Sequence, residues 1–149
     1  MTEFIRRAIP DDAAALAVLD QLADDWPWPE RRIAQACGDT VGQRVLMLEL
    51  DGKPAAFVSF ALVLDEGSIY RIAVHPAQRR RGLGGQLLDT ALAQLRQQGA
   101  SRCLLELRRG NQAAYALYRS RGFILDGERP AYYPGTEGRE DALLMSLQW

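Results

Sequence analysis

The run Arg79-Arg80-Arg81-Gly82-Leu83-Gly84-Gly85 lies between a strand-like segment, Ser68 to Val74, and a strongly helical segment, Leu83 to Gln98. Glycine permits close backbone approach. A helix N-terminus presents unpaired N–H groups at the positive end of its dipole. Three arginines add positive charge and hydrogen-bond donors. The run therefore predicts a turn that cradles a pyrophosphate or a similar anion.

Two common phosphate-binding motifs do not fit this run. The dinucleotide-binding fingerprint requires G-x-G-x-x-G after the first strand, but here the glycines come mid-chain and Leu87 stands at the third glycine position. The Walker motif requires a lysine beside the last glycine, and the only lysine is Lys53. The sequence therefore predicts an anion-binding turn that follows neither of these motifs.

Length and composition indicate an ordinary globular protein. The chain has 149 residues, 48% of them hydrophobic and 25% charged, so we expect a single domain over residues 1–149. The two cysteines, Cys37 and Cys103, lack metal-ligand spacing and suggest no disulfide framework. We expect no metal site, no signal peptide and no membrane span, and therefore a cytoplasmic location.

Charge is unevenly distributed although the net charge is only −1. Residues 71–121 carry 10 basic and 2 acidic groups, whereas residues 1–70 carry 6 and 12, and residues 122–149 carry 2 and 5. The middle of the chain favours an anion, and its flanks favour a cation. A nucleic-acid-binding protein is more often basic overall, so we do not expect nucleic acid as a partner.

Hydrophobic periodicity predicts an alternation of strands and helices. The expected strands are Phe4–Ala8, Val45–Leu50, Pro54–Leu64, Ser68–Val74, Arg102–Leu107, Phe123–Glu128 and Ala142–Gln148. The expected helices are Pro10–Asp24, Glu30–Cys37, Leu83–Gln98 and Asn111–Arg121. Antiparallel strands at the start, with an Asp51-Gly52 hairpin turn, followed by two βαβ-like crossings, predict a mixed α/β sheet.

A carboxylate interrupts the apolar strand Arg102–Leu107. By period-two alternation, Glu106 shares a face with Leu104 and Arg108. A carboxylate in such a strand must reach water, an arginine or a substrate. Two interpretations stay open: an ion pair with Arg108 or Arg129, and a catalytic base.

The following helix offers a second polar group. Tyr118 comes seven residues after Asn111, so two helical turns place both on one face. Tyr118 is either plain core or a proton donor to a leaving group. Asn111 is either a helix cap only or also a ligand-facing side chain.

Several motifs resemble those of GNAT-fold N-acetyltransferases. The C-terminal half of the resemblance consists of Leu105-Glu106-Leu107-Arg108-Arg109-Gly110-Asn111, Leu117-Tyr118 and Gly122-Phe123. Arg79-x-x-Gly82-x-Gly84 is similar to the acetyl-CoA signature of that superfamily. More specifically, Arg129-Pro130-Ala131-Tyr132-Tyr133-Pro134 and Gly138-Arg139-Glu140-Asp141-Ala142 resemble the ribosomal-protein-alanine N-acetyltransferase family (RimI).

This resemblance implies a mostly antiparallel mixed sheet flanked by helices, with acetyl-CoA as co-substrate. It implies Glu106 as catalytic base and Tyr118 as acid. It implies a peptide groove at Tyr132, Tyr133 and Glu140 that accepts the basic, alanine-starting N-terminus of a small-subunit ribosomal protein. The residues expected to bind the cofactor are Ile72, Ala73, Val74, Arg79, Arg80, Arg81, Gly82, Leu83, Gly84, Gly85 and Asn111.

Departures from the family pattern bear on the acceptor. Gly110 replaces the usual serine, and Trp26 the usual histidine, so the peptide that fits can differ. One alternative is an acetyltransferase for a small-molecule amine, other protein N-termini or lysines, although the Tyr132-Tyr133 segment argues against a small amine. Another is a non-catalytic CoA-binding module, which the retention of Glu106 and Tyr118 argues against. A purely structural role for the tyrosine pair also stays open.

Overall fold

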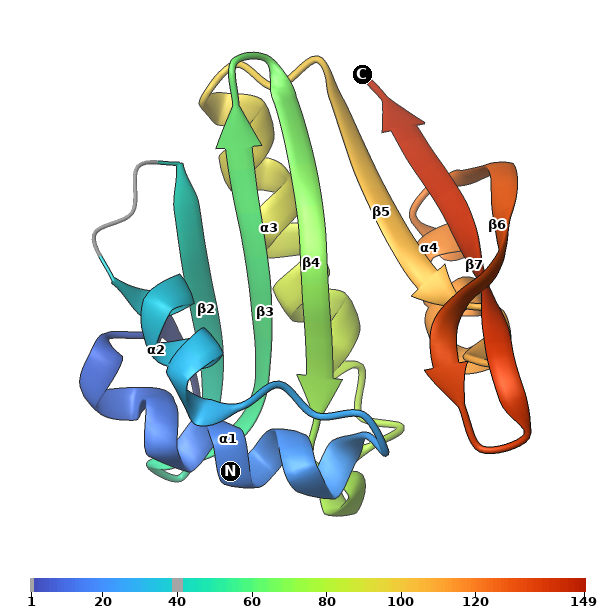
Figure 1. Cartoon of the computed structure of the whole chain (residues 1–149). Helices are drawn as coiled ribbons and strands as arrows, with labels where there is room; N and C mark the ends of the chain where they lie inside the picture. Colours follow the sequence, from blue (N-terminus) through green and yellow to red (C-terminus); the bar gives the residue numbers. More distant parts are fainter. Residues whose placement is uncertain (1, 39–41) are drawn as a thin grey trace.

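The computed structural model describes residues 2–38 and 42–149, and shows a seven-stranded sheet with helices on both faces (Figure 1). The strands are β1 (Glu3–Arg7), β2 (Gln43–Leu50), β3 (Lys53–Val63), β4 (Glu66–Val74), β5 (Arg102–Arg108), β6 (Ile124–Gly135) and β7 (Gly138–Gln148). The helices are α1 (Ala13–Ala23), α2 (Glu30–Cys37), α3 (Leu83–Gln97) and α4 (Gln112–Ser120), with 3-10 turns η1 (Pro10–Asp12) and η2 (Pro76–Gln78).

The strands follow the order β1-β2-β3-β4-β5-β7-β6 across the sheet. Neighbouring strands are antiparallel except β4 and β5, which are parallel and connected through α3. The predicted fold class, a mixed and mostly antiparallel sheet flanked by helices, is confirmed. The second predicted crossing, through α4, does not make β5 and β6 neighbours, because β7 lies between them.

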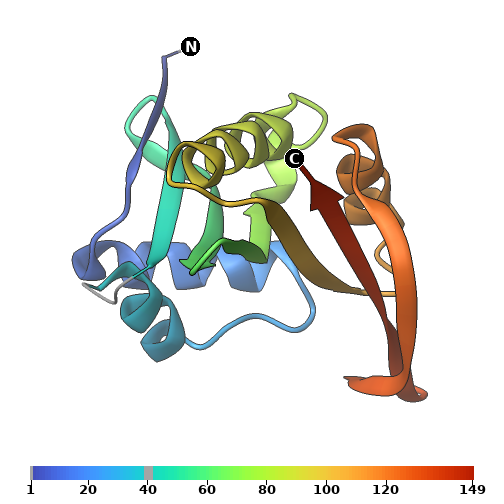
Figure 2. The same cartoon turned by 90° about the horizontal axis from the view of Figure 1, so that it is seen from above.

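Helices α3 and α4 lie on one face of the sheet and α1 and α2 on the other (Figure 2). Each pair of helices covers an apolar core. On one face, α3 and α4 pack on the strands, and the predicted α3 stripe is buried at Leu83, Leu87, Leu88, Ala91, Leu92 and Leu95. On the other face, α1 and α2 cover residues of β2, β3 and β4 around Phe57. Among the described residues, no helix combines the length and apolar character that a bilayer crossing requires.

The start of the first helix differs from the prediction. Pro10–Asp12 forms the 3-10 turn η1, and α1 begins only at Ala13. The Asp12 carboxylate accepts the Ile9 N–H at 2.8 Å and pairs with Arg6 of β1 at 2.8 Å. These local hydrogen bonds favour a tight turn over a regular first helical turn.

The C-terminal hairpin is longer than predicted. The expected strand Phe123–Glu128 ends well before the turn, and the expected strand Ala142–Gln148 begins well after it. In the structure β6 continues to Gly135 and β7 begins at Gly138. Tyr132 and Tyr133 therefore belong to a strand. Proline inside a run normally argues against a strand, but β6 is at the edge of the sheet, where a missing N–H costs no ladder bond.

Candidate active site

The parallel strands β4 and β5 separate along their length. They pair only from Glu66 opposite Arg102 to Ile69 opposite Leu105. Beyond that point the two strands diverge (Figure 1). A groove of about 1600 Å³ is lined there by residues of both strands, among them residues 72–74 of β4 and residues 106–108 of β5. On the groove side, the backbone of residues 72–74 pairs with no strand in the described part of the chain, so its polar groups can pair with an extended ligand.

The turn between β4 and α3 lies at one end of this groove. Arg79 and Arg80 line the groove, and α3 begins after Gly82. Arg80 and Gly82 have φ of +67° and +75°, the left-handed conformation that glycine adopts readily. The N-cap residue of α3 is Gly82, which has no side chain that could cap the helix. The first N–H groups of the helix thus receive no cap from this residue, and the anion site at this turn stays a prediction.

The predicted cofactor residues divide into two sets. Ile72, Ala73, Val74, Arg79, Arg80, Leu83, Gly84 and Asn111 line the groove, whereas Arg81, Gly82 and Gly85 do not. A side chain at Gly85 would collide with the guanidinium of Arg121, which pairs with Asp89 at 3.0 Å. Because the contact is with the far end of a flexible side chain, Arg121 can shift, and the contact does not by itself require glycine at position 85. Asn111 caps α4, since its side-chain oxygen accepts the Ala114 N–H at 3.2 Å.

Glu106 lines the groove on the face of β5 that the alternation predicted. Its Oε1 lies 3.5 Å from Nη1 of Arg129, and its side chain is 34% exposed. The ion pair that the sequence left open is therefore formed with Arg129. The carboxylate still faces the groove, so the pair leaves it accessible to a bound amine.

Tyr118 lines the same groove from α4 and is 6% exposed. Its ring packs against Phe123 with centroids 5.6 Å apart. Burial raises the pKa of the Tyr118 hydroxyl far above its ordinary value. The hydroxyl is thus protonated at neutral pH and able to donate to a group in the groove.

Tyr132, Tyr133 and Glu140 line the groove from the β6–β7 hairpin. The two tyrosine rings meet edge to face, with centroids 4.9 Å apart. Burial raises the pKa of the Tyr133 hydroxyl, and the nearby charge of Glu106 raises it further. Tyr133 therefore lies within electrostatic reach of Glu106.

Tyr132 and Tyr133 lie at a bulge in β6, which changes the direction of their side chains. The register shifts between Arg129 and Tyr133. Arg139 donates to the carbonyls of Ala131 and Tyr132 at 2.7 and 2.8 Å, and Asp141 accepts the Ala131 N–H at 2.8 Å. The Gly138-Arg139-Glu140-Asp141 motif thus holds the bulge in shape, and bulges commonly redirect side chains near active sites.

The sequence model of the acetyltransferase (GNAT) family matches residues 13–123. The chain belongs to the acetyltransferase (GNAT) family. It is 41% identical over 138 residues to the [ribosomal protein bS18]-alanine N-acetyltransferase of Escherichia coli strain K12, covering 91% of this chain and 90% of that protein. The predicted resemblance to the ribosomal-protein-alanine N-acetyltransferases is confirmed.

Solved structures agree with this assignment. The crystal structure of the ribosomal-protein-S18-alanine N-acetyltransferase from Escherichia coli superposes with a TM-score of 0.92, at 37% identity, covering 99% of this chain and 94% of that one. The PaiA N-acetyltransferase from Thermoplasma acidophilum, in complex with coenzyme A, shares the fold with a TM-score of 0.82 at 14% identity, and each chain is covered completely. This GNAT member is an acetyl-CoA-dependent N-acetyltransferase.

Sequence reasoning missed an ion pair beneath the acetyltransferase groove. Asp20 of α1 is fully buried, accepts the Trp28 N–H at 2.8 Å and pairs with Arg71 of β4 at 2.8 Å. Arg71 also lies 3.3 Å from Asp24. The pair fixes the segment between α1 and α2 over the sheet. An arginine within the apolar strand Ser68–Val74 was a signal that could have revealed it.

Sequence reasoning also missed Asp126, which lines the groove from β6. The register of β6 shifts between Leu125 and Gly127, so Asp126 is the extra residue of a second bulge. Because the bulge depends on pairing with β7, the sequence alone gave no signal for it.

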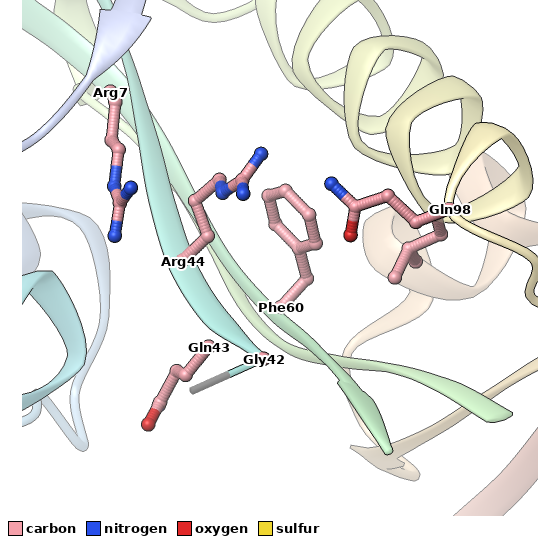
Figure 3. Close-up of a pocket in the computed structure, with 7 residues that line it drawn as sticks. Arg7, Gly42, Gln43, Arg44, Phe60 and Gln98 are labelled. Carbon is pink, nitrogen blue, oxygen red and sulfur yellow. The ribbon is translucent and has the colours of Figure 1, made fainter. Parts of the chain in front are cut away.

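A second cavity of about 340 Å³ lies away from the acetyltransferase groove and shares no lining residue with it. Figure 3 shows its side chains, which come from β1, β2, β3 and the end of α3, including Arg7, Arg44, Phe60 and Gln98. Arg44 donates to Gln94 at 3.0 Å. Its separation from Glu106 and Tyr118 makes it no part of the candidate active site.

Proposed function

We propose that this acetyltransferase moves acetyl from acetyl-CoA to the N-terminal alanine α-amine of a small-subunit ribosomal protein. The observation that carries the proposal is that one groove is lined by Glu106 and Tyr118, by Arg79 and Arg80 of the turn before α3, and by Tyr133 of the β6–β7 hairpin. Relatives named as alanine N-acetyltransferases of ribosomal protein bS18 support the acceptor.

The cofactor end of the groove suits acetyl-CoA. The α3 N-terminus with Arg79 and Arg80 would hold the pyrophosphate, and the free backbone edge of residues 72–74 would pair with the pantetheine arm. The side-chain oxygen of Gln78 lines the groove, buried and without a hydrogen-bond partner among the described residues. It would accept an amide N–H of that arm. A backbone N–H near Val74 would stabilise the oxyanion.

The reaction is a direct attack. The amine nitrogen forms a bond to the thioester carbonyl carbon, and the carbon–sulfur bond then breaks. Glu106 takes the amine proton directly or through water, and the Tyr118 hydroxyl protonates the departing sulfur. Each proton transfer contributes about 10²–10⁴ in rate. Holding both reactants in line supplies the rest.

The base strength required favours an α-amine over lysine. An α-amine has a pKa of about 7.7–8.0 and lysine about 10.4, so roughly a tenth of the former is neutral at pH 7 and far less than about one per cent of the latter. A carboxylate base therefore acts more easily on a peptide N-terminus.

The free carboxylates of the groove favour a cationic peptide. Five acidic residues line it, namely Asp24, Asp25, Glu106, Asp126 and Glu140. Three of them pair with arginines, and in the described part of the chain Asp25 and Asp126 form no ion pair. These two charges complement a basic residue next to the acceptor amine.

The proposal is tested with acetyl-CoA and three peptides, beginning Ala-Arg, beginning Met-Glu, or carrying only an internal lysine. We expect a mass shift and thiol release with the first peptide alone. Glu106→Gln should lower kcat by about 10²-fold with little change in coenzyme A affinity. Glu128→Gln, an exposed carboxylate outside the groove that pairs with Arg109, is the matched control. Turnover with small amines only, or an unimpaired Glu106→Gln variant, would contradict the proposal.

A further inference from the structure

Arg108 contacts two aromatic rings from distant parts of the chain. Its guanidinium carbon is 4.6 Å from the ring centroid of Trp26 and 4.7 Å from that of Tyr133. Its Nη1 donates to the Pro134 carbonyl at 2.6 Å and to the Glu140 carboxylate at 3.1 Å. With two ring contacts and two hydrogen bonds, this side chain is only 19% exposed.

These contacts join the two segments that border the acceptor end of the groove. Trp26 belongs to the segment between α1 and α2, whereas Tyr133, Pro134 and Glu140 belong to the β6–β7 hairpin. Arg108 itself ends β5, two residues beyond Glu106 on the same face of the strand. A shift of Arg108 would therefore move both walls beside Glu106.

The segment between α1 and α2 is fixed independently at its base. Asp20 accepts the Trp28 N–H and pairs with Arg71, and Asp24 accepts the Trp26 N–H at 2.8 Å. These bonds hold the backbone over the sheet but do not reach the hairpin. The link from Trp26 to the hairpin passes through the guanidinium of Arg108.

We propose that Arg108 is a positioning residue that connects the Trp26 segment to the β6–β7 hairpin. It thereby sets the width of the groove where the acceptor peptide would bind. The role in acceptor binding rests on the proposed function. Only a planar, forked cation fits: guanidinium stacks on rings while its N–H groups bind carbonyl and carboxylate, whereas an ammonium group does not stack in this way. Trp26, where the family usually has histidine, supplies one of the two rings.

The test compares Arg108→Met and Arg108→Lys with the unmodified chain. Arg109→Met is the matched control, because Arg109 pairs with exposed Glu128 at 2.5 Å and does not line the groove. Without ligand, hydrogen–deuterium exchange of residues 24–28 and 131–136 should quicken about tenfold in both Arg108 variants and stay unchanged in Arg109→Met. With an Ala-Arg peptide, the peptide KM should rise about tenfold while kcat and the acetyl-CoA KM stay within about twofold.

Trp26→Ala provides a second route if Arg108→Met does not fold, since Trp26 is 37% exposed. It should also raise the peptide KM. Where Arg108→Met does fold, the double variant should have a peptide KM no higher than that of Arg108→Met alone. Unchanged hydrogen–deuterium exchange in the Arg108 variants would show that Arg108 does not connect the two segments. Faster exchange with an unchanged peptide KM overturns its role in acceptor binding. If the unmodified chain acetylates no peptide, the proposed function fails, while exchange still decides whether Arg108 joins the two segments.

Discussion

At the scale of single residues, Tyr118 combines burial with a position in the groove. Burial raises the pKa of the Tyr118 hydroxyl, so the hydroxyl stays protonated throughout the neutral range, and in the proposed mechanism it would give this proton to the departing sulfur. We predict that Tyr118→Phe lowers kcat by about 10²-fold and leaves coenzyme A affinity unchanged, because the ring keeps its packing on Phe123. Steady-state kinetics and calorimetry measure the two quantities. An unchanged kcat in Tyr118→Phe would show that Tyr118 contributes only to packing of the core.

The two cysteines argue against an acyl-enzyme route. Both are buried, and burial raises the pKa of Cys37 to about 11 and that of Cys103 to about 12. At pH 7 roughly one thiol in ten thousand or fewer is a thiolate, the nucleophilic form. We predict no rapid reaction of the native chain with an aromatic disulfide reagent and two thiols released after denaturation. Full activity of Cys103→Ala would agree, whereas its inactivation with an intact fold would favour a cysteine intermediate.

Residue positions were predictable where a single element fixes them. Alternation along one strand predicted that Glu106 shares a face with Leu104 and Arg108, and helical spacing predicted that Tyr118 shares a face with Asn111; all five residues line the groove. Partners from distant elements were not predictable. The sequence left Glu106 with two possible arginines, and only the register of β6 on β7 selects Arg129. The contacts of Arg108 with Trp26 and Tyr133 depend on three separate segments and had no local signature.

At the scale of elements, Asp12 links the 3-10 turn η1 to the first strand. Its carboxylate accepts the Ile9 N–H and two hydrogen bonds from Arg6, which also pairs with Glu49 of β2. The Arg6 guanidinium lowers the pKa of Asp12 below its ordinary value, and the Ile9 N–H adds to this. The charged carboxylate therefore stabilises the fold above the unfolded pKa of about 3.9, and this stability is lost as the pH falls through the lower folded value.

We accordingly predict that Asp12→Asn lowers the free energy of unfolding by about 1–2 kcal/mol at pH 7. The difference from the unmodified chain should shrink as the pH falls below about 4. Urea unfolding at pH 7 and near pH 3 measures it. Asp11→Asn is the control, because Asp11 makes no ion pair within the described residues. A difference that is constant with pH would show that Asp12 acts through packing and not through its charge.

Element prediction succeeded where apolar periodicity was strong and failed where tertiary pairing overrides local chemistry. The α3 stripe and the Asp51-Gly52 turn, with φ of +52° and +82°, follow the sequence rules directly. The β6–β7 hairpin was underestimated because Pro130, Pro134 and Gly135 signal a loop locally. Pairing with β7 and the hydrogen bonds of Arg139 and Asp141 extend the strand through them.

At the scale of the whole molecule, the sheet consists of two halves, β1–β4 and β5–β7, joined by one short parallel register. That register spans only Glu66–Ile69 against Arg102–Leu105. The separation of the halves beyond it creates the groove, and elements from both halves line it. A ligand that pairs with β4 and contacts the α3 turn would therefore bridge a gap that the polypeptide leaves open.

Coenzyme A should consequently stabilise the whole fold and not only a loop. At about 100 times its dissociation constant a ligand adds about 2.7 kcal/mol, which corresponds to a rise in Tm of roughly 5–10 °C for a chain of this length. Thermal melts with coenzyme A measure the rise in Tm. Pantetheine at the same concentration should give a much smaller rise, because it lacks the pyrophosphate that would bind the turn at Arg79 and Arg80. Arg44→Gln, in the separate cavity of Figure 3, should leave the rise unchanged. An equal rise in Tm with pantetheine would show that the α3 turn does not bind the pyrophosphate. Loss of the rise in Arg44→Gln would show that coenzyme A binds in the other cavity.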